Sequence, residues 1–506
     1  MDGKPTGISL GEGVRRASPA RRMASRSDET QVINLTADHE PQQNYSEAEN
    51  VPFRFQLASE DSSSLPPVNF TSAGPVHHKK KPQASWIHAG GHTVTAVVGV
   101  GVLALPYTFS YLTWAGGLIL LALSMAISLY TSYLLAALHQ EESGTRRDTY
   151  IELAKAILGE RAGFWAVGPV QWTVMLGLCV TYMVTAGQSL QAAHRPDCSG
   201  HVYSGPGGEA THEECSSSLT WWIVAFSFVQ LGLSQLKDFH SIWWISIVGA
   251  IMSACYSTIA FATSTAEYDG SASYARRSGD GADFIFEVFN SLGTIMFAFG
   301  GHAVLLEIEA TLATPPAPVV SMMKGLYLAY IVIFFAYFAV GIAGYAAFGN
   351  GVDADVLLTV TRPQWLIRIA NVMVVVHVGA SWQVFAQPVF EAIEAGIARR
   401  KPAWTGHIPK FRWAWRGAYV VLTAALAISI PFFQALMGLV GALGFTPMTF
   451  VLPPILWQKA KGSSVPAWQR WLHIIIAVAS FLAGTLAVVG SLRNIIVKVG
   501  SYHYGG

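Results

Sequence analysis

The chain has 506 residues, of which 52% are hydrophobic and only 12% are charged, and its formal net charge is +1. Soluble domains carry about 25% charged residues, so this composition excludes an ordinary soluble protein and indicates a membrane protein. The basic residues are scattered between apolar runs and do not form one face, which argues against a nucleic-acid-binding surface.

The N-terminal part of the chain, residues 1–84, is polar and rich in Ser, Pro, Glu and Gln. It has no apolar core segment and no small-residue cleavage site, so we expect no signal peptide. Segments of this composition bury too little apolar surface to fold. We therefore predict a disordered tail over 1–84 and a transmembrane domain over 85–506.

From Trp86 onward, apolar runs follow one another with short polar interruptions. Crossing a bilayer takes roughly 17 to 25 residues, and the runs are long enough to do so. We place about eleven, at 86–112, 114–138, 163–193, 219–235, 240–266, 284–313, 319–347, 363–396, 412–430, 433–457 and 471–495. Two joints between runs are tight and are marked by Trp114 and Pro431. The fold class predicted is an all-α membrane protein.

Basic residues next to the runs indicate the orientation, because cytoplasmic loops collect Lys and Arg. One set of loops holds Lys79, Lys80, Lys81, Arg146, Arg147, Lys237, Lys324, Arg399, Arg400, Lys401, Lys410, Lys459, Lys461 and Arg470. The opposite loops hold Arg195, Arg276, Arg277 and Arg362 among many acidic residues. We therefore expect a cytosolic N-terminus and an external C-terminus.

The four cysteines divide into two pairs. Cys198 and Cys215 flank one polar loop, which the predicted orientation places outside the cell, so we expect a disulfide between them. Cys179 and Cys255 lie within apolar runs and are expected to be small buried hydrophobic residues.

The first apolar run contains the stretch VVGVGVLALP, from Val97 to Pro106. Gly99 and Gly101 remove side chains that would shield the backbone, and Pro106 has no N–H to donate, so the helix is weakened. In a bilayer such a break is tolerated only where it faces protein or a polar cavity. Its free amides can face an anionic group such as a carboxylate. A second interpretation remains open, in which glycine simply permits close helix packing.

A second interrupted segment, FAFGGHAVLLEIEAT, spans Phe297 to Thr311 in the sixth run. Gly300 and Gly301 again stand in the middle of the run. Broken helices at corresponding places in two halves are typical of secondary transporters with inverted repeats. Two repeats of five helices and one extra helix account for the eleven runs, with helices 1 and 6 broken.

Charged groups at membrane depth are costly, so each needs a reason. Glu307 follows the second break and His302 adjoins its glycines, so both are candidates for accepting and releasing a proton as substrate binds. The alternative is that Glu307 only joins loose helix ends through hydrogen bonds. Glu309 is expected to reach water at the cytosolic end, and His377 is expected to be a hydrogen-bonded core residue. Glu391 and Glu394 are expected to be structural.

Enzyme chemistry is not supported by the pattern. The loop histidines His201 and His212 have no partners at zinc-like spacing apart from the cysteines, so we expect no metal site. Gly99, Gly101 and Ala104 match a dinucleotide fingerprint, but no strand–turn–helix unit surrounds them. No nucleophile–base pair survives the same test of context.

Four segments resemble the plant amino acid/auxin permease family, and most closely its lysine/histidine transporter-like branch. They are HTVTAVVGVGVLALPYTFSYLTWAGG, FNSLGTIMFAFGGHAVLLEIEAT, GYAAFGN and GLVGALGFTPMTFVLPPILW. The resemblance runs from about Trp86 to Trp457 with the runs in the same order. It implies an eleven-span, proton-coupled amino acid symporter of the fold shared with the amino acid–polyamine–organocation group, working by alternating access.

The resemblance also implies a substrate site at the two unwound helices. It assigns Val98, Gly99, Gly101 and Val102 to the substrate carboxylate, and Phe297, Gly300, Gly301 and His302 to its amine. Tyr182, in the family-like stretch CVTYMVTAGQSL, is expected to line the cavity. Two departures are that SYLTW, Ser110 to Trp114, lacks the glycine that relatives usually have before the tryptophan, and that the loop 194–218 is longer.

The leading hypothesis is therefore a symporter that imports an amino acid, with the proton as coupling ion and no other cofactor. The expected partners are the amino acid and the lipid bilayer, with no nucleic acid, and the oligomeric state is left open. The family's default location is the plasma membrane. A passive facilitator or auxin carrier would keep the same breaks without titration. A nutrient sensor would bind an amino acid and signal through residues 1–84 without appreciable flux.

Overall fold

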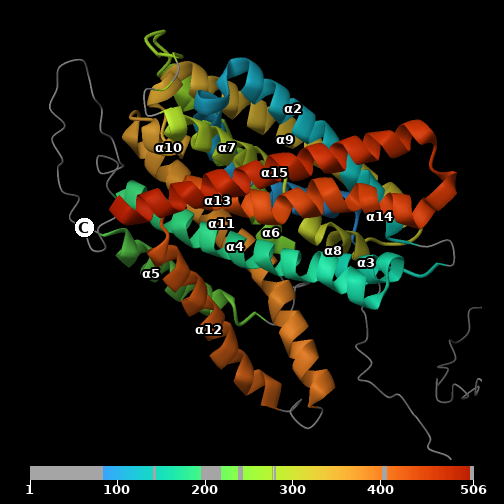
Figure 1. Cartoon of the computed structure of the whole chain (residues 1–506). Coiled ribbons are helices and arrows are strands. Elements are labelled where there is room, and N and C mark those ends of the chain that lie inside the picture. Colours follow the sequence, from blue (N-terminus) through green and yellow to red (C-terminus); the bar gives the residue numbers. More distant parts are fainter. Residues whose placement is uncertain are drawn as a thin grey trace, which may run out of the picture. The chain divides into compact units, whose positions relative to one another are not determined.

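The structure is a computed structural model that describes residues 84–140, 144–194, 218–236, 243–275, 277, 281–401 and 407–501. The predicted tail, apart from Ala84, and both Cys198 and Cys215 lie outside the described residues. What is described belongs to one compact unit, 73–506. This part of the chain contains no strand and only two isolated β-bridges (Figure 1), which confirms the all-α class.

Each of the eleven predicted runs coincides with helical structure. Seven are single helices: α4 (Glu160–His194), α5 (Leu219–Leu233), α6 (Trp243–Ala266), α9 (Pro318–Phe348), α11 (Gln364–Arg400), α12 (Ile408–Ser429) and α15 (Ala467–Ser501). Within the described residues, eight helices are long and apolar enough to cross a membrane when short irregular turns are bridged, and α5 is a shorter apolar helix.

The first, sixth and tenth runs are interrupted. The first comprises α1 (Trp86–Val97), the 3₁₀ helix η1 (Val100–Ala104) and the start of α2 (Leu105–Leu138); the sixth comprises α7 (Gly281–Ala298), η4 (His302–Val304) and α8 (Leu305–Ala310). The tenth, expected as one regular helix, is α13 (Phe433–Val440), a π-helical stretch (Gly441–Val451) and α14 (Leu452–Lys461). Pro447 lies inside this π-helical stretch, where it cannot donate a backbone hydrogen bond. The wider π winding was not predicted.

The first and second runs meet inside α2. Thr113 has φ 64° and ψ 174°, so the backbone turns there although helical residues stand on both sides. The kink lies within the tight joint predicted between residues 112 and 114. Two short helices, α3 (Tyr150–Leu158) and α10 (Val356–Thr359), lie in connections between runs.

Loops that were predicted to share one side of the membrane contact each other. On the side predicted to be external, Asn350 donates its backbone N–H to the carbonyl of Ser273 at 2.9 Å. On the opposite side, Arg146 donates to the carbonyl of Leu312 at 3.4 Å, and Ala84 forms a β-bridge with Leu312. These contacts agree with the predicted alternation of the loops.

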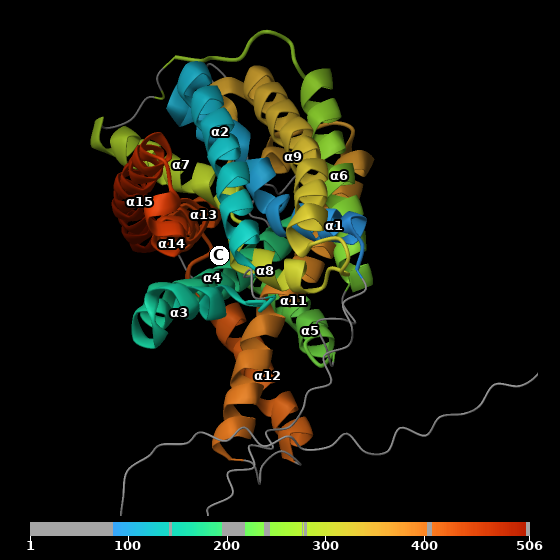
Figure 2. The same ribbon diagram turned by 90° about the vertical axis from the view of Figure 1, so that its right-hand side faces the viewer.

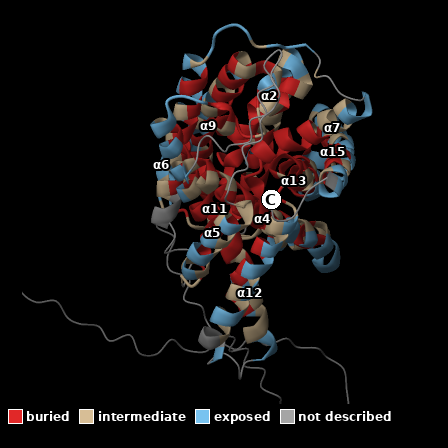
Figure 3. Ribbon diagram, turned by 90° about the vertical axis from the view of Figure 1, so that its left-hand side faces the viewer, coloured by how far each residue is buried: buried red, intermediate tan, exposed pale blue. Residues whose placement is uncertain are grey.

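The distribution of burial is that of a protein surrounded by lipid. Figure 3 shows buried residues gathered where α4, α11 and α13 meet, with exposed residues on outer faces such as those of α6 and α15. Many of the exposed residues are large and apolar, among them Trp365, Ile475, Phe481 and Ile496. Such faces are a liability in water and are natural against lipid tails. α12 and the end of α11 extend away from the other helices (Figure 2).

Candidate functional site

The first helix break lies where the sequence predicts it. α1 ends at Val97, and Val98 and Gly99 leave the helical conformation before η1 begins at Val100. Because η1 continues into α2, the amides of Val100 and Gly101 stand at the N-terminus of a long helical segment. The first amides of a helix have no acceptor within it, and they carry the positive end of its dipole.

The second break has the same form. α7 ends at Ala298, Phe299 to Gly301 are irregular, and η4 begins at His302 and leads into α8. The turn is closed by short-range backbone bonds, such as that from Gly301 N–H to the carbonyl of Phe299 at 3.0 Å. A second set of helix N-terminal amides is therefore placed in the protein interior.

The two breaks lie side by side, and their glycines permit the approach. A Cβ added to Gly101 would lie 3.1 Å from Cα of Ala298, at the end of α7. A Cβ added to Gly301 would lie only 2.5 Å from Cγ2 of Val97, at the end of α1, which is closer than real contacts allow. The packing role that sequence analysis left open for glycine is therefore real, and it coexists with the breaks.

One tyrosine connects both breaks. Tyr337 of α9 places its hydroxyl 2.7 Å from the carbonyl of Val97 and 2.6 Å from the carbonyl of Ala298. These are the last residues of α1 and α7, whose carbonyls lack a continuing helix. A phenol has one proton, so it donates to one carbonyl at a time. Sequence analysis missed this residue.

A second group of polar side chains surrounds Gly99. Tyr256 of α6 donates its hydroxyl to the carbonyl of Gly99 at 3.1 Å. A Cβ added to Gly99 would lie 3.6 Å from the hydroxyl of Tyr182 and 3.7 Å from Nε2 of His377. The hydroxyl of Tyr182 therefore lies beside the first break. His377 is hydrogen-bonded in the core, through Nδ1 to the carbonyl of Gly249 at 2.9 Å.

The remaining predicted substrate residues divide between the breaks and their surroundings. Val98 and Val102 are fully buried at the first break, and Phe297 packs its ring edge-to-face on Phe445. Gly300 also faces that ring, because a Cβ added to it would lie 2.3 Å from Phe445. These four residues form apolar walls next to the irregular backbone of the breaks.

His302 faces α2. Its Nε2 lies 3.0 Å from Oγ1 of Thr131 and 3.1 Å from Oγ of Ser132, and the ring is 1% exposed. Next to this pair, Ser128 lies 2.6 Å from the hydroxyl of Tyr330 of α9. The imidazole therefore belongs to a buried polar network between α2, α9 and the second break.

Glu307 lies one turn after the second break. Its Oε1 accepts a hydrogen bond from the amide of Gln171 of α4 at 3.3 Å, and the same amide donates to the carbonyl of Ala303 at 2.9 Å. Its buried Oε2 has no hydrogen-bond partner among the described residues. The carboxyl group is thus held by an uncharged amide, and no ion pair among the described residues includes it.

The expectation that Glu309 reaches water was wrong. Its side chain is fully buried and lies 3.8 Å from Nδ1 of His139, which is fully buried as well. Nε2 of this histidine lies 3.5 Å from Asp148, whose side chain is 24% exposed. Successive residues of a helix turn by about 100°, so Glu309 faces a different direction from Glu307. The three side chains lead from a buried carboxyl group toward the surface.

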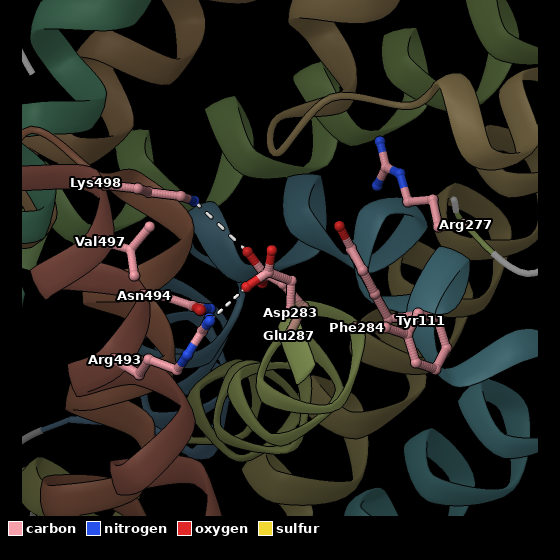
Figure 4. Close-up of a pocket in the computed structure, with 9 residues that line it drawn as sticks. All are labelled: Tyr111, Arg277, Asp283, Phe284, Glu287, Arg493, Asn494, Val497 and Lys498. Carbon is pink, nitrogen blue, oxygen red and sulfur yellow. Dashed lines mark hydrogen bonds and ion pairs between the residues drawn. The ribbon is translucent and has the colours of Figure 1, made fainter. Parts of the chain in front are cut away.

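Another cluster of charges lies on the side predicted to be external, around a cavity of about 220 Å³ (Figure 4). Asp283 of α7 forms an ion pair with Arg493 of α15, and Glu287 lies 3.7 Å from Lys498. Arg277 stacks over the rings of Tyr107 and Tyr111. Each acidic side chain of α7 therefore faces a cation of α15, and the cluster fastens the last helix to the first half of the sixth run.

Within the described residues, no group of three or more potential metal ligands converges. The loop histidines His201 and His212 and the predicted Cys198–Cys215 disulfide lie outside the described residues. Cys179 is buried and Cys255 half-buried, and both are free.

Comparison with known proteins supports the same interpretation. The family model described as transmembrane amino acid transporter protein matches residues 82–497. The protein Lysine histidine transporter-like 6 of Arabidopsis thaliana is 40% identical over 428 residues, covering 83% of this chain and 93% of its own. Lysine histidine transporter-like 1 of the same plant is 37% identical, with 83% and 90% covered. Amino acid permease 6, also from Arabidopsis thaliana, is 32% identical, with 83% and 92% covered.

Proposed function

Because the chain belongs to the transmembrane amino acid transporter family, we propose that it is a proton-coupled symporter that imports an amino acid by alternating access. The observation that carries the proposal is the contact between the two helix breaks. Gly101 of the first break lies against Ala298, directly before the second. One small zwitterion can reach the backbone of both breaks at once.

The two ends of an amino acid need opposite partners. The amides of Val100 and Gly101, at the start of η1, are donors for a carboxylate. The carbonyl of Gly300, in the second break, is an acceptor for an ammonium group, whereas that of Phe299 already accepts from Gly301 N–H and from Ser128. Tyr182, beside Gly99, would line the space for the side chain. The site therefore recognises the part common to all amino acids through backbone atoms.

Proton coupling is assigned to the carboxyl groups after the second break. Glu307 has a neutral amide, Gln171, as its partner, and such a partner tolerates both the protonated and the ionised carboxyl group. Protonation from outside would favour the loaded state, and release inside would reset the transporter. Glu309, His139 and Asp148 form a second candidate route between the interior and the surface.

We propose further that the N-terminus is cytosolic, that the C-terminus is external and that the protein acts in the plasma membrane. The asymmetry of basic residues between the two sets of loops supports this orientation. The location is the default of the family.

The test is substrate-induced current in voltage-clamped oocytes, with amino acids screened at acidic and at neutral external pH. We expect inward currents that grow at acidic pH and that disappear in Glu307→Gln. Glu160→Gln is the matched control, because Glu160 is 83% exposed at the start of α4. Surface labelling of each variant verifies equal expression.

The other outcomes separate the rival functions. Uptake of a labelled amino acid without current and without pH dependence contradicts proton coupling and identifies a passive carrier. An indole acid as the only substrate identifies an auxin-like carrier. Binding of an amino acid by surface-expressed protein, with neither uptake nor current, identifies a sensor.

A further inference from the structure

A cavity of about 750 Å³ lies away from the two helix breaks, between α4, the end of α11 and the start of α12. It is lined by Trp172, Ala392, Ile393, Gly396, Ile397, Arg399, Arg400, Lys401 and Phe411. This is the region where α12 and the last turns of α11 extend away from the other helices (Figures 1 and 2). The size is within the usual range for sites that hold a small molecule, about 300–1,000 Å³.

The lining has two chemically different parts. Its wall is apolar and includes Ile393, Ile397 and the ring of Trp172, which is 46% exposed. Its rim consists of the consecutive cations Arg399, Arg400 and Lys401 at the end of α11, all of them exposed. A ligand that matches both parts carries a negative group next to an apolar chain.

Helix C-termini favour cations, so the basic rim alone does not require a ligand. One of the two acids in this segment, Glu394, is already neutralised by residues of α12. Glu394 is held by Arg412 at 2.7 Å and by the fully buried Arg416 at 2.8 Å. Among the described residues, no ion pair includes Arg399 or Arg400.

The surrounding segment is also strongly basic. Between residues 391 and 416 the chain has six Lys or Arg residues and two Glu residues. The proposed orientation places the rim at the cytosolic leaflet, where anionic lipids are concentrated. Arginine forks match phosphate oxygens in pairs. Tryptophan prefers the boundary between lipid tails and headgroups.

We propose that this cavity binds an anionic phospholipid, with the phosphate headgroup on Arg399 and Arg400 and the upper acyl chain against Ile393, Ile397 and Trp172. Binding also has a path to the transport site. Trp172 is next to Gln171, whose amide holds Glu307. The lipid thus contacts α4 directly beside the residue that positions the candidate coupling carboxyl group.

The test measures binding of phosphatidylserine and of phosphatidylcholine to the full-length protein purified in detergent, by native mass spectrometry. Detergent removes any dependence on the orientation in the membrane or on transport, so the result stands apart from the proposed function. We expect preferential retention of phosphatidylserine, and a loss of about tenfold in its affinity when Arg399→Gln and Arg400→Gln are combined.

Matched variants make the result specific. Lys459→Gln with Lys461→Gln removes the same charge at the end of α14, on the same predicted side, and should leave the affinity unchanged. Arg399→Lys with Arg400→Lys keeps the charge and should retain most of the binding. Trp172→Ala should weaken binding of phosphatidylserine although no charge is lost. Thermal unfolding without added lipid verifies that every variant is folded.

Three outcomes would overturn the proposal. An equal loss in the Lys459 and Lys461 variant means that the lipid is attracted by overall charge. Competition by inorganic phosphate as strong as that by the lipid means that the rim is a free-anion site. Unchanged binding in both the arginine and the Trp172 variants means that the cavity holds no lipid.

Discussion

Oε1 of Glu309 lies 3.8 Å from Nδ1 of His139, and neither side chain reaches solvent. The contact joins α8 to the end of α2 on the side where the loops are most basic. The two atoms are too far apart for a hydrogen bond, so His139→Ala removes a polar contact and the packing of a buried side chain, and losses of this kind cost about 0.5–3 kcal/mol. We expect His139→Ala to lower the free energy of unfolding by about that amount.

The double variant isolates the contact. Glu309→Gln in the His139→Ala background replaces the other member of the contact, so the loss for the pair should be smaller than the sum of the two single losses if the side chains interact. Unfolding in detergent, followed by intrinsic fluorescence, gives the four values of the cycle. Strictly additive losses would show that the two side chains do not interact.

Gly301 tests the close approach of the breaks. In Gly301→Ala the new Cβ would lie 2.5 Å from Cγ2 of Val97. Overpacking of this kind costs about 1–3 kcal/mol, so we expect uptake at equal surface expression to fall about tenfold. Combining it with Val97→Ala removes the clashing methyl group and should restore part of the uptake. Gly351→Ala is the control, because a Cβ there meets nothing within 4 Å.

If Val97→Ala fails to rescue Gly301→Ala while the control retains full uptake, the breaks do not lie against each other as described. A loss of uptake in Gly351→Ala equal to that in Gly301→Ala would instead indicate a general intolerance of added side chains.

Tyr337→Phe tests the hydroxyl that lies against both breaks. It leaves the carbonyl of Ala298 without a donor, while that of Val97 keeps the backbone N–H of Gly99, so we expect the free energy of unfolding to fall by about 1–3 kcal/mol. The apparent affinity for the amino acid should fall as well. Tyr327→Phe on the same helix is the control, because Tyr327 is 56% exposed. Equal behaviour of the two variants would deny Tyr337 a role at the breaks.

The helix breaks were predictable because glycine and proline act locally. A pair of glycines in the middle of an apolar run weakens the helix whatever surrounds it. Tyr337 was not predictable, because its partner Val97 is 240 residues away in the chain. A tyrosine in an apolar run carries no sign of the carbonyl that it will reach.

Glu309 shows a different limit. Glu309 was expected near the end of its helix, and it does lie there. That position along the helix axis was the reason for expecting contact with water. Burial depends also on which face of the helix a residue occupies and on what packs there. The partner, His139, ends a helix 170 residues earlier in the chain, and no local pattern relates the two positions.

Asp355 gives the protein a predictable dependence on pH. It lies between α9 and α11, where its carboxylate accepts the backbone N–H of Leu357 at 2.9 Å, and burial raises its pKa to about 7. The ordinary pKa of an aspartate is about 4, so the folded state binds the proton more tightly than the unfolded state. Stability from this group is therefore full below about pH 4 and is lost as the pH rises to about 7.

Asp355→Asn keeps an oxygen that can cap α10 and has no charge to bury. We expect its melting temperature to exceed that of the wild type above about pH 7. The difference should shrink as the pH falls toward about 4. Melting curves in detergent across this range provide the measurement. Parallel pH profiles for the two proteins would rule out a contribution from Asp355.

The family resemblance leads us to expect a glycine at the position of Thr113, and the backbone there is of the kind that glycine adopts. The combination of φ 64° and ψ 174° belongs to a region that is populated almost only by glycine and costs other residues about 1–3 kcal/mol. Glycine loses more chain entropy on folding, which offsets about 0.5–1 kcal/mol of the relief. We therefore expect Thr113→Gly to raise the free energy of unfolding by about 1 kcal/mol. The measurement is unfolding in detergent. Thr113→Ala keeps the Cβ, so it should give no such gain. An equal rise in both variants would mean that the effect comes from the threonine side chain and not from the backbone.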